Sequence, residues 1–219
     1  MADSPSSSHS EQASTNPKFR VVGHRRFLTK GNNKYLLPAD ELEMDRLDYQ
    51  HSIIKIVRKA NFEAPVEALL RKGIKVLDVG CGSGNFNGNK SNPIQTQFLQ
   101  SKHHFIGITY LLPVRAATQA RDIDITFQHD LVHLLGTASL VNIQSDQVSC
   151  PIGWYGRVGE LAIGNMRQLF SSMKPILSIA MGLSEREYDR IINEILDGFG
   201  KHRTWCRGLG AYGTKPYIL

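Results

Sequence analysis

A short segment in the first half of the chain constrains the fold more than any other feature. Residues 74–79, Ile-Lys-Val-Leu-Asp-Val, have the composition of a buried parallel strand, which Gly80 ends. Gly80, Gly82 and Gly84 alternate with single residues, the first of them Cys81, where a small side chain is needed. Because glycine lets a backbone approach a ligand closely, the segment predicts a nucleotide-type binding loop at the tip of a strand.

The charge of this loop selects among the nucleotide cofactors. A dinucleotide site has its third glycine one residue later, and a P-loop requires a Gly-Lys-Ser/Thr that is absent here. Asp78 lies two positions before the first glycine, where a carboxylate would repel a pyrophosphate and suit a cationic ligand. S-adenosylmethionine carries an ammonium and a sulfonium, so the residues favour it. The alternative is a glycine-rich turn that binds nothing.

The chain divides into a tail and two structured parts. Residues 1–18 are rich in serine and predict a disordered tail, because they cannot bury enough apolar area to offset the entropy of ordering. Residues 19–72 predict an N-terminal helical cap segment, and residues 73–219 a Rossmann-like domain. Further strands are expected at 104–108 and 123–128. This alternation indicates an α/β sheet covered by helices.

Capping signals and apolar periodicity locate the helices. Asp40 with Glu43, and Ser184 with Glu187, match the capping-box pattern. The predicted helices are 38–60, about 65–71, 157–173, which Pro175 limits, and 185–199. Two short terminal strands near 202–206 and 209–212 are expected to turn through Arg207-Gly208. No period dominates in residues 131–152.

Composition narrows the classes of function. The chain has 26 Lys and Arg against 20 Asp and Glu, a formal net charge of +6, but its positive charges are scattered. We therefore expect a solvated basic surface and no nucleic-acid groove. Three cysteines in no zinc-site spacing predict a reduced chain without a metal site. Neither a membrane span nor a secretory signal is expected, which leaves the cytoplasm or the nucleus.

Three blocks of sequence together carry a resemblance to a known family. They are residues 35–51, Tyr-Leu-Leu-Pro-Ala-Asp-Glu-Leu-Glu-Met-Asp-Arg-Leu-Asp-Tyr-Gln-His; residues 76–84; and residues 181–188 with their continuation to 212–216. In these blocks the chain resembles the fungal secondary-metabolism methyltransferases, the group that includes the LaeA-type regulators. The resemblance covers about residues 19–130 and 153–217. It implies a class I methyltransferase sheet with S-adenosylmethionine at the strand ends.

The resemblance also implies roles for individual residues. It places the loop Asp78, Gly80, Cys81, Gly82 and Gly84 on the methionine and ribose side of the cofactor, and Asp130 near the adenine. The segment Arg46 to His51 is expected near the cofactor or over the pocket, and a solvated helix face with salt bridges is the equal alternative. His51 is the candidate catalytic base, although a lone histidine is more often a surface or core residue.

Two departures from the family pattern bear on activity. Thr109 stands where the second strand normally ends in an acidic residue that binds the ribose hydroxyls, and a hydroxyl makes weaker bonds than a carboxylate. Residues 131–152 replace the longer stretch that normally holds the fourth and fifth strands. We therefore expect a sheet whose central strands are missing or shortened.

Methyl transfer from S-adenosylmethionine to a small-molecule acceptor is the function that these residues favour. A catalytically degenerate methyltransferase-like protein with a regulatory or interaction role is the alternative, and it leaves room for a protein partner. An NAD-dependent oxidoreductase fits the loop less well, for the reasons given above.

Overall fold

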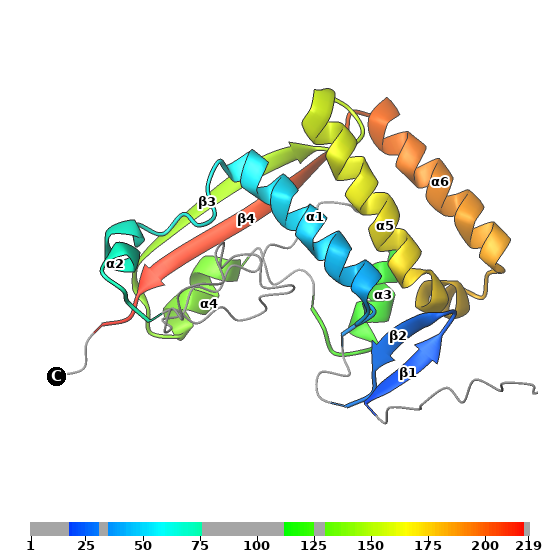
Figure 1. The fold of residues 1–219 in the computed structure, drawn as a ribbon, viewed down its shortest axis with the longest axis horizontal. Coiled ribbons are helices and arrows are strands. Elements are labelled where there is room, and N and C mark those ends of the chain that lie inside the picture. Colours follow the sequence, from blue (N-terminus) through cyan, green and yellow to red (C-terminus); the bar gives the residue numbers. More distant parts are fainter. Residues whose placement is uncertain (1–17, 31–34, 76–111, 125–129, 217–219) are drawn as a thin grey trace, which may run out of the picture.

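The computed structural model describes residues 18–30, 35–75, 112–124 and 130–216. In this part of the chain the protein has a mixed α/β structure in which α5 lies between α1 and α6 (Figure 1). Two antiparallel two-stranded sheets accompany the helices. The elements are β1 (Phe19–Val22), β2 (Arg25–Leu28), α1 (Glu41–Arg58), α2 (Glu67–Arg71), α3 (Leu112–Gln119), α4 (Leu131–Thr137), β3 (Val141–Pro151), α5 (Gly156–Met181), α6 (Glu185–Lys201) and β4 (Trp205–Thr214).

The predicted parallel sheet falls mostly on residues that the structure does not describe. This holds for the glycine loop and for most of the strands expected at 74–79, 104–108 and 123–128. The predicted tail lies outside the described residues as well, apart from its last residue. The Rossmann-like arrangement and its shortened central strands therefore stay predictions.

Helices α1 and α6 confirm the predictions made from their capping residues. The Ser184 hydroxyl accepts a hydrogen bond from the Glu187 backbone N–H at 3.3 Å, and Glu187 Oε2 accepts one from the Ser184 N–H at 2.9 Å. Asp40 caps α1 by accepting from the Glu43 N–H at 3.1 Å. The Glu43 carboxylate binds Arg46 instead of returning to the cap, so the predicted capping box of α1 is only half formed.

Helix α5 is longer than the sequence predicts, because it continues through Pro175 to Met181. A proline inside a helix removes one backbone hydrogen bond and crowds the preceding turn. Met173 and Leu177 are buried on either side of it and hold both halves of the helix against the core. The Ser178 hydroxyl also donates to the Lys174 carbonyl at 2.7 Å. Tertiary burial therefore overrides the local stop signal.

Strands β1 and β2 form a hairpin that packs on this proline. Val22 pairs with Arg25, which leaves a two-residue loop of Gly23 and His24. Their φ angles are 53° and 64°, as in the turn whose twist matches paired strands. A Cβ on Gly23 would lie 3.1 Å from Pro175 Cγ, so the turn contacts the proline closely.

Strands β3 and β4 form one long antiparallel ribbon, which corrects the expectation of two short terminal strands. The predicted turn at Arg207-Gly208 is wrong, because Arg207 pairs with Ser149 and Gly208 with Val148 within a continuous strand. The region 131–152, where no period is evident, forms α4 and β3. Most of β3 is exposed on both faces, which explains why its sequence lacks an alternation of apolar and polar residues.

The main core lies around α5. It joins side chains from α3, α5, α6 and the start of β4, and the Tyr188 hydroxyl of α6 donates to the Phe170 carbonyl of α5 at 2.8 Å. A smaller cluster joins Ile53, Cys150 and Ala162, where β3 meets α1 and α5. Among the described residues, no helix combines the length and apolarity needed to cross a membrane.

Candidate functional site

The structure describes two of the residues that the sequence singles out. Asp130 immediately precedes α4, and His51 lies within α1. The remaining predicted cofactor-binding residues lie outside the described ranges; they are Asp78, Gly80, Cys81, Gly82, Gly84 and Thr109. The site is therefore built here from the elements around Asp130 and around α1.

Asp130 occupies the N-cap position of α4 without capping the helix. Its side chain makes no cap hydrogen bond, and the residue is exposed. Four backbone N–H groups at a helix start normally seek such a partner. An uncommitted carboxylate at this position can accept hydrogen bonds from a ligand, as the role implied for Asp130 requires.

Leu131 and Val132, which follow Asp130 in the sequence, line a cavity of about 270 Å³. It lies between the first turn of α4 and the middle of the β3–β4 ribbon. Its wall combines apolar side chains with a carboxylate, a hydroxyl and an amide, a mixture typical of small-molecule sites. The lining residues are Leu131, Val132, Ser145, Asp146, Gln147, Leu209 and Gly210.

Arg58, at the end of α1, supplies the positive charge next to this cavity. Its guanidinium is almost wholly buried, forms an ion pair with Glu63, and lies 3.7 Å from the Asp146 carboxylate. It also donates to the Gly208 carbonyl of β4 at 3.2 Å. Burial lowers the pKa of Arg58, and the nearby Asp146 charge opposes that effect.

Glycines in β4 make room for this ion pair. A Cβ on Gly210 would lie 2.6 Å from Glu63 Oε2 and 3.2 Å from Arg58 Nη1. An alanine at position 210 would therefore require the ends of the Glu63 and Arg58 side chains to move away from the ribbon. Sequence reasoning missed Arg58, and the glycines at 208 and 210 were the available signal.

The polar residues of α1 form a buried network on its α5 side. Arg46 is 1% exposed. Its guanidinium donates hydrogen bonds to the side-chain oxygens of Glu43 at 2.6 Å, Gln50 at 2.7 Å and Asn165 at 3.1 Å. Asn165 belongs to α5 and is also buried. Of the two alternatives for the segment from Arg46 to His51, the solvated face is wrong for Arg46, which instead joins α1 to α5.

A second ion pair extends this network to the hairpin. Arg25 of β2 binds both carboxylate oxygens of Asp40, at 2.7 and 2.8 Å, and donates to the Ser172 hydroxyl at 3.3 Å. Its hydrogen bonds hold the pKa of the Asp40 carboxyl below its usual range. Asp40, from the block at residues 35–51, therefore takes part in the contact between β2, α1 and α5 that Arg25 makes.

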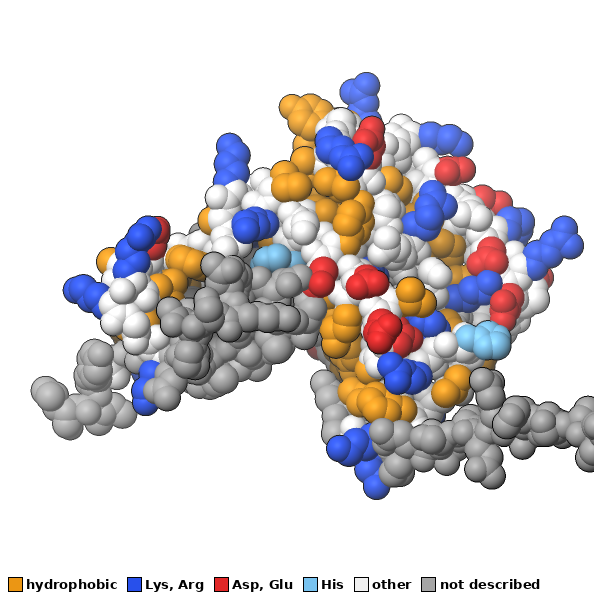
Figure 2. All heavy atoms as spheres, in the orientation of Figure 1, with side chains coloured by type: hydrophobic (Ala, Val, Ile, Leu, Met, Phe, Trp, Pro, Cys, Tyr) orange, Lys and Arg blue, Asp and Glu red, His pale blue; other side chains and the backbone are white. Residues whose placement is uncertain are grey.

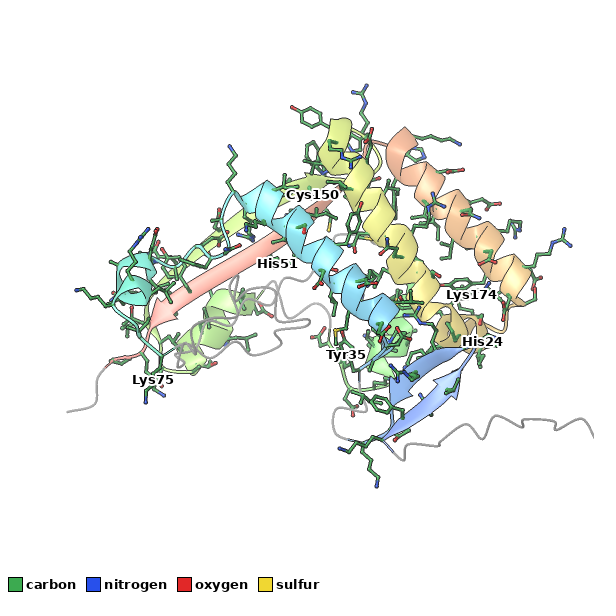
Figure 3. All side chains as sticks on the ribbon, viewed as in Figure 1. His24, Tyr35, His51, Lys75, Cys150 and Lys174 are labelled. Carbon is green, nitrogen blue, oxygen red and sulfur yellow. The ribbon has the colours of Figure 1, made fainter. Side chains whose placement is uncertain are left out.

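His51 lies apart from the Arg46 network. It follows Gln50 and is turned by about 100° around the helix from it, since an α-helix has 3.6 residues per turn. The residue, labelled on α1 in Figure 3, is half-buried. No described contact joins it to Asp130 or to the cavity, so its role as a base stays a prediction.

Comparison with known proteins finds similarity over one segment. The chain is 40% identical over 52 residues to the "Secondary metabolism regulator LAE1" of Pyricularia oryzae, which is 24% of this chain and 16% of that protein. It is 39% identical over 51 residues to the protein of the same name from Cochliobolus heterostrophus, 23% of this chain and 17% of that one. The matched segment thus spans about a sixth of each relative. No family model and no solved structure matches the chain.

Proposed function

We propose that the protein is a class I methyltransferase of the fungal secondary-metabolism group, which transfers a methyl group from S-adenosylmethionine to a small-molecule acceptor. The segment shared with two secondary metabolism regulators supports the group. The observation that supports a cofactor is Asp130, whose carboxylate makes no cap hydrogen bond and which precedes the two α4 residues that line the cavity, Leu131 and Val132.

The described residues around the cavity support a nucleoside ligand. Asp130 would accept a hydrogen bond from the exocyclic amine of adenine, and Leu131 and Val132 would contact the face of the base. The Asp146 carboxylate lines the same cavity, where Arg58 at 3.7 Å offsets part of its charge. Asp78 and its glycines would hold the methionine end, as the charge of the loop predicts.

In the proposed reaction the protein's main tasks are to position the two substrates and to enclose them away from water. S-adenosylmethionine, when bound, supplies an electrophilic methyl group next to a sulfonium. The apolar walls at Leu131, Val132 and Leu209 would exclude water, while the carboxylates would orient the bound nucleoside. An acceptor that is already nucleophilic needs no dedicated base, so the proposal assigns none beyond the candidate His51.

Isothermal titration of S-adenosylhomocysteine tests the proposal. Wild-type protein is expected to bind it, and Asp130→Asn is expected to bind about tenfold more weakly, because a neutral acceptor replaces a charged one. Asp130 makes no cap hydrogen bond, so the variant should fold normally. Glu67→Gln, at an exposed site on α2, is the matched control and should bind like wild type. Absence of binding by the wild-type protein would refute the proposal.

A degenerate, regulatory role is the second candidate, because Thr109 departs from the acidic residue of the family. Thr109→Asp should tighten binding of S-adenosylhomocysteine if the ribose site is otherwise intact. An unchanged affinity, together with weak binding by the wild-type protein, would favour the regulatory role.

A further inference from the structure

Three aromatic side chains gather where α5 and β4 begin. Trp154 and Tyr155 connect β3 to α5, and Trp205 is the first residue of β4. The ring centroid of Trp154 lies 4.7 Å from that of Trp205 and 5.6 Å from that of Tyr155, and both pairs meet edge to face. Tyr155 is 74% exposed and Trp205 43% exposed. We call these three residues the aromatic platform.

The platform is held in place by its surroundings. The Trp154 indole N–H donates to the Thr204 carbonyl at 2.8 Å. The Gly153 N–H donates to the Gly159 carbonyl at 2.9 Å, and Gly159 leaves no room for a Cβ against the Trp154 backbone. Tyr155 has a φ of 65°, a left-handed conformation that non-glycine residues seldom adopt. A rigid loop thus exposes a tyrosine at the cost of backbone strain, a pattern associated with binding sites.

Two arginines, Arg203 and Arg207, lie beside the platform. The segments around it, residues 146–160 and 197–207, contain four Lys or Arg and three Asp or Glu, and within the described residues neither of the two arginines forms an ion pair. Arg203 lies 5.9 Å from the Trp154 ring centroid, and Arg207 follows Trp205 on the same face of β4. Arg157 is exposed, and the acidic neighbour it contacts is Glu160 at 3.5 Å. Figure 2 shows hydrophobic, basic and acidic side chains together at the top of the molecule, where α5 begins.

The ring geometry decides between anionic partners. Successive nucleic-acid bases stack on open, roughly parallel ring faces. Here Trp154 and Trp205 are inclined by 86°, and Trp154 also has Arg203 over its ring. Exposed Trp and Tyr next to Arg are instead typical of the residues that dominate protein–protein interfaces. Acidic side chains would complement the surrounding arginines and set the orientation of binding.

We propose that the aromatic platform, with Arg203 and Arg207, is a docking surface for an acidic segment of a partner protein that carries an apolar or aromatic anchor. The anchor would pack against Tyr155 and Trp205, and flanking carboxylates would pair with the two arginines. This surface is independent of the proposed methyl transfer, so either proposal can fail alone.

Selection from a random peptide display library on the immobilised full-length chain tests this surface. Enriched peptides are expected to place Asp or Glu on both sides of an aromatic or aliphatic residue. A synthetic peptide of the enriched sequence, labelled with fluorescein, should show saturable anisotropy. Trp205→Ser and Arg203→Gln should each weaken its binding at least about tenfold, as expected for residues at the centre of an interface.

Matched variants distinguish specific binding at this surface from non-specific binding of the peptide. Ile179→Ser removes an equally exposed apolar side chain at the far end of α5, and Arg115→Gln removes an exposed charge on α3. Both should bind the peptide like wild type. Circular dichroism should show that all four variants keep the fold. The proposal is overturned if no acidic consensus emerges, if the controls lose binding equally, or if single-stranded DNA or anionic vesicles bind the platform more tightly than the peptide does.

Discussion

Arg46 of α1 donates a hydrogen bond of 3.1 Å to the side-chain oxygen of Asn165 in α5, and both residues are buried. The two residues are far apart in the sequence, so this bond fixes how α1 sits on the central helix. Arg46 also forms an ion pair with Glu43 at 2.6 Å. Each of the two side chains is only 2% exposed, so both charges are shielded from water.

Removing one member of this pair should therefore be costly. Arg46→Ala leaves the Glu43 carboxylate buried without a counter-charge and should lower the free energy of unfolding by about 3–5 kcal/mol. The double variant Glu43→Leu/Arg46→Met should recover most of that loss, because it removes both charges. Urea unfolding followed by circular dichroism measures both.

The exposed pair Arg71–Glu67 of α2 provides the control. Its side chains are 77% and 68% exposed, and Arg71→Ala should change stability by less than about 1 kcal/mol. Equal losses for Arg46→Ala and Arg71→Ala would show that the α1 network does not hold the helices together.

Acid should weaken the junction between the hairpin and α1. Arg25 holds the folded-state pKa of Asp40 below its unfolded value near 3.9. The stability from Asp40 is therefore fully present above about pH 4 and is lost as the pH falls through the lowered folded-state pKa. Asp40→Asn should flatten this acid limb of a plot of unfolding free energy against pH. An unchanged limb would mean that other carboxyl groups account for acid unfolding.

A methyl group on Gly210 should displace the Arg58–Glu63 pair. The added Cβ would lie 2.6 Å from Glu63 Oε2, the end of a flexible side chain that can move away, so Gly210→Ala is expected to cost at most about 1.5 kcal/mol. Gly136→Ala is the control, because its Cβ meets only Ile143 Cδ1 at 3.8 Å within α4. The control should be neutral or stabilise the fold by up to about 1 kcal/mol. Thermal unfolding of the two variants distinguishes them.

Cys150 should react slowly in the folded protein. Burial raises the pKa of its thiol to about 11, so little thiolate exists near neutral pH. Cys150 is 1% exposed and pairs across the ribbon with the buried Cys206 (Figure 3). Iodoacetamide labelling read by peptide mass spectrometry should modify Cys150 far faster in urea than in buffer. Rapid labelling in buffer would show that the ribbon opens readily.

Local signals made some elements predictable. The cap and the apolar periodicity that define helix α6 lie within or next to the helix itself. The structure confirms the predicted helix 185–199, which extends to Lys201. Asp40 located the start of α1 for the same reason. Neither helix needs distant contacts to be recognised.

Other elements depend on contacts that a single stretch of sequence does not reveal. Gly208 and Arg207 looked like a turn, but both pair with β3 inside a continuous strand, and the nearby Gly210 lies against Arg58 and Glu63. Pro175 looked like a helix end, but burial of Met173 and Leu177 carries α5 past it. At the site, the resemblance singles out Asp130 as a prediction that the structure does not test, whereas the cavity depends on α4 meeting the ribbon.

The β3–β4 ribbon also bears on the order in which the chain assembles. Its two strands flank α5 and α6 in the sequence, and Pro151 pairs with Trp205 only after both helices have been traversed. Closing so long a loop costs entropy before the pairing returns any stabilisation. We therefore expect the α5–α6 hairpin to form early and to bring the strand ends together, so that ribbon pairing is a late, slow kinetic phase.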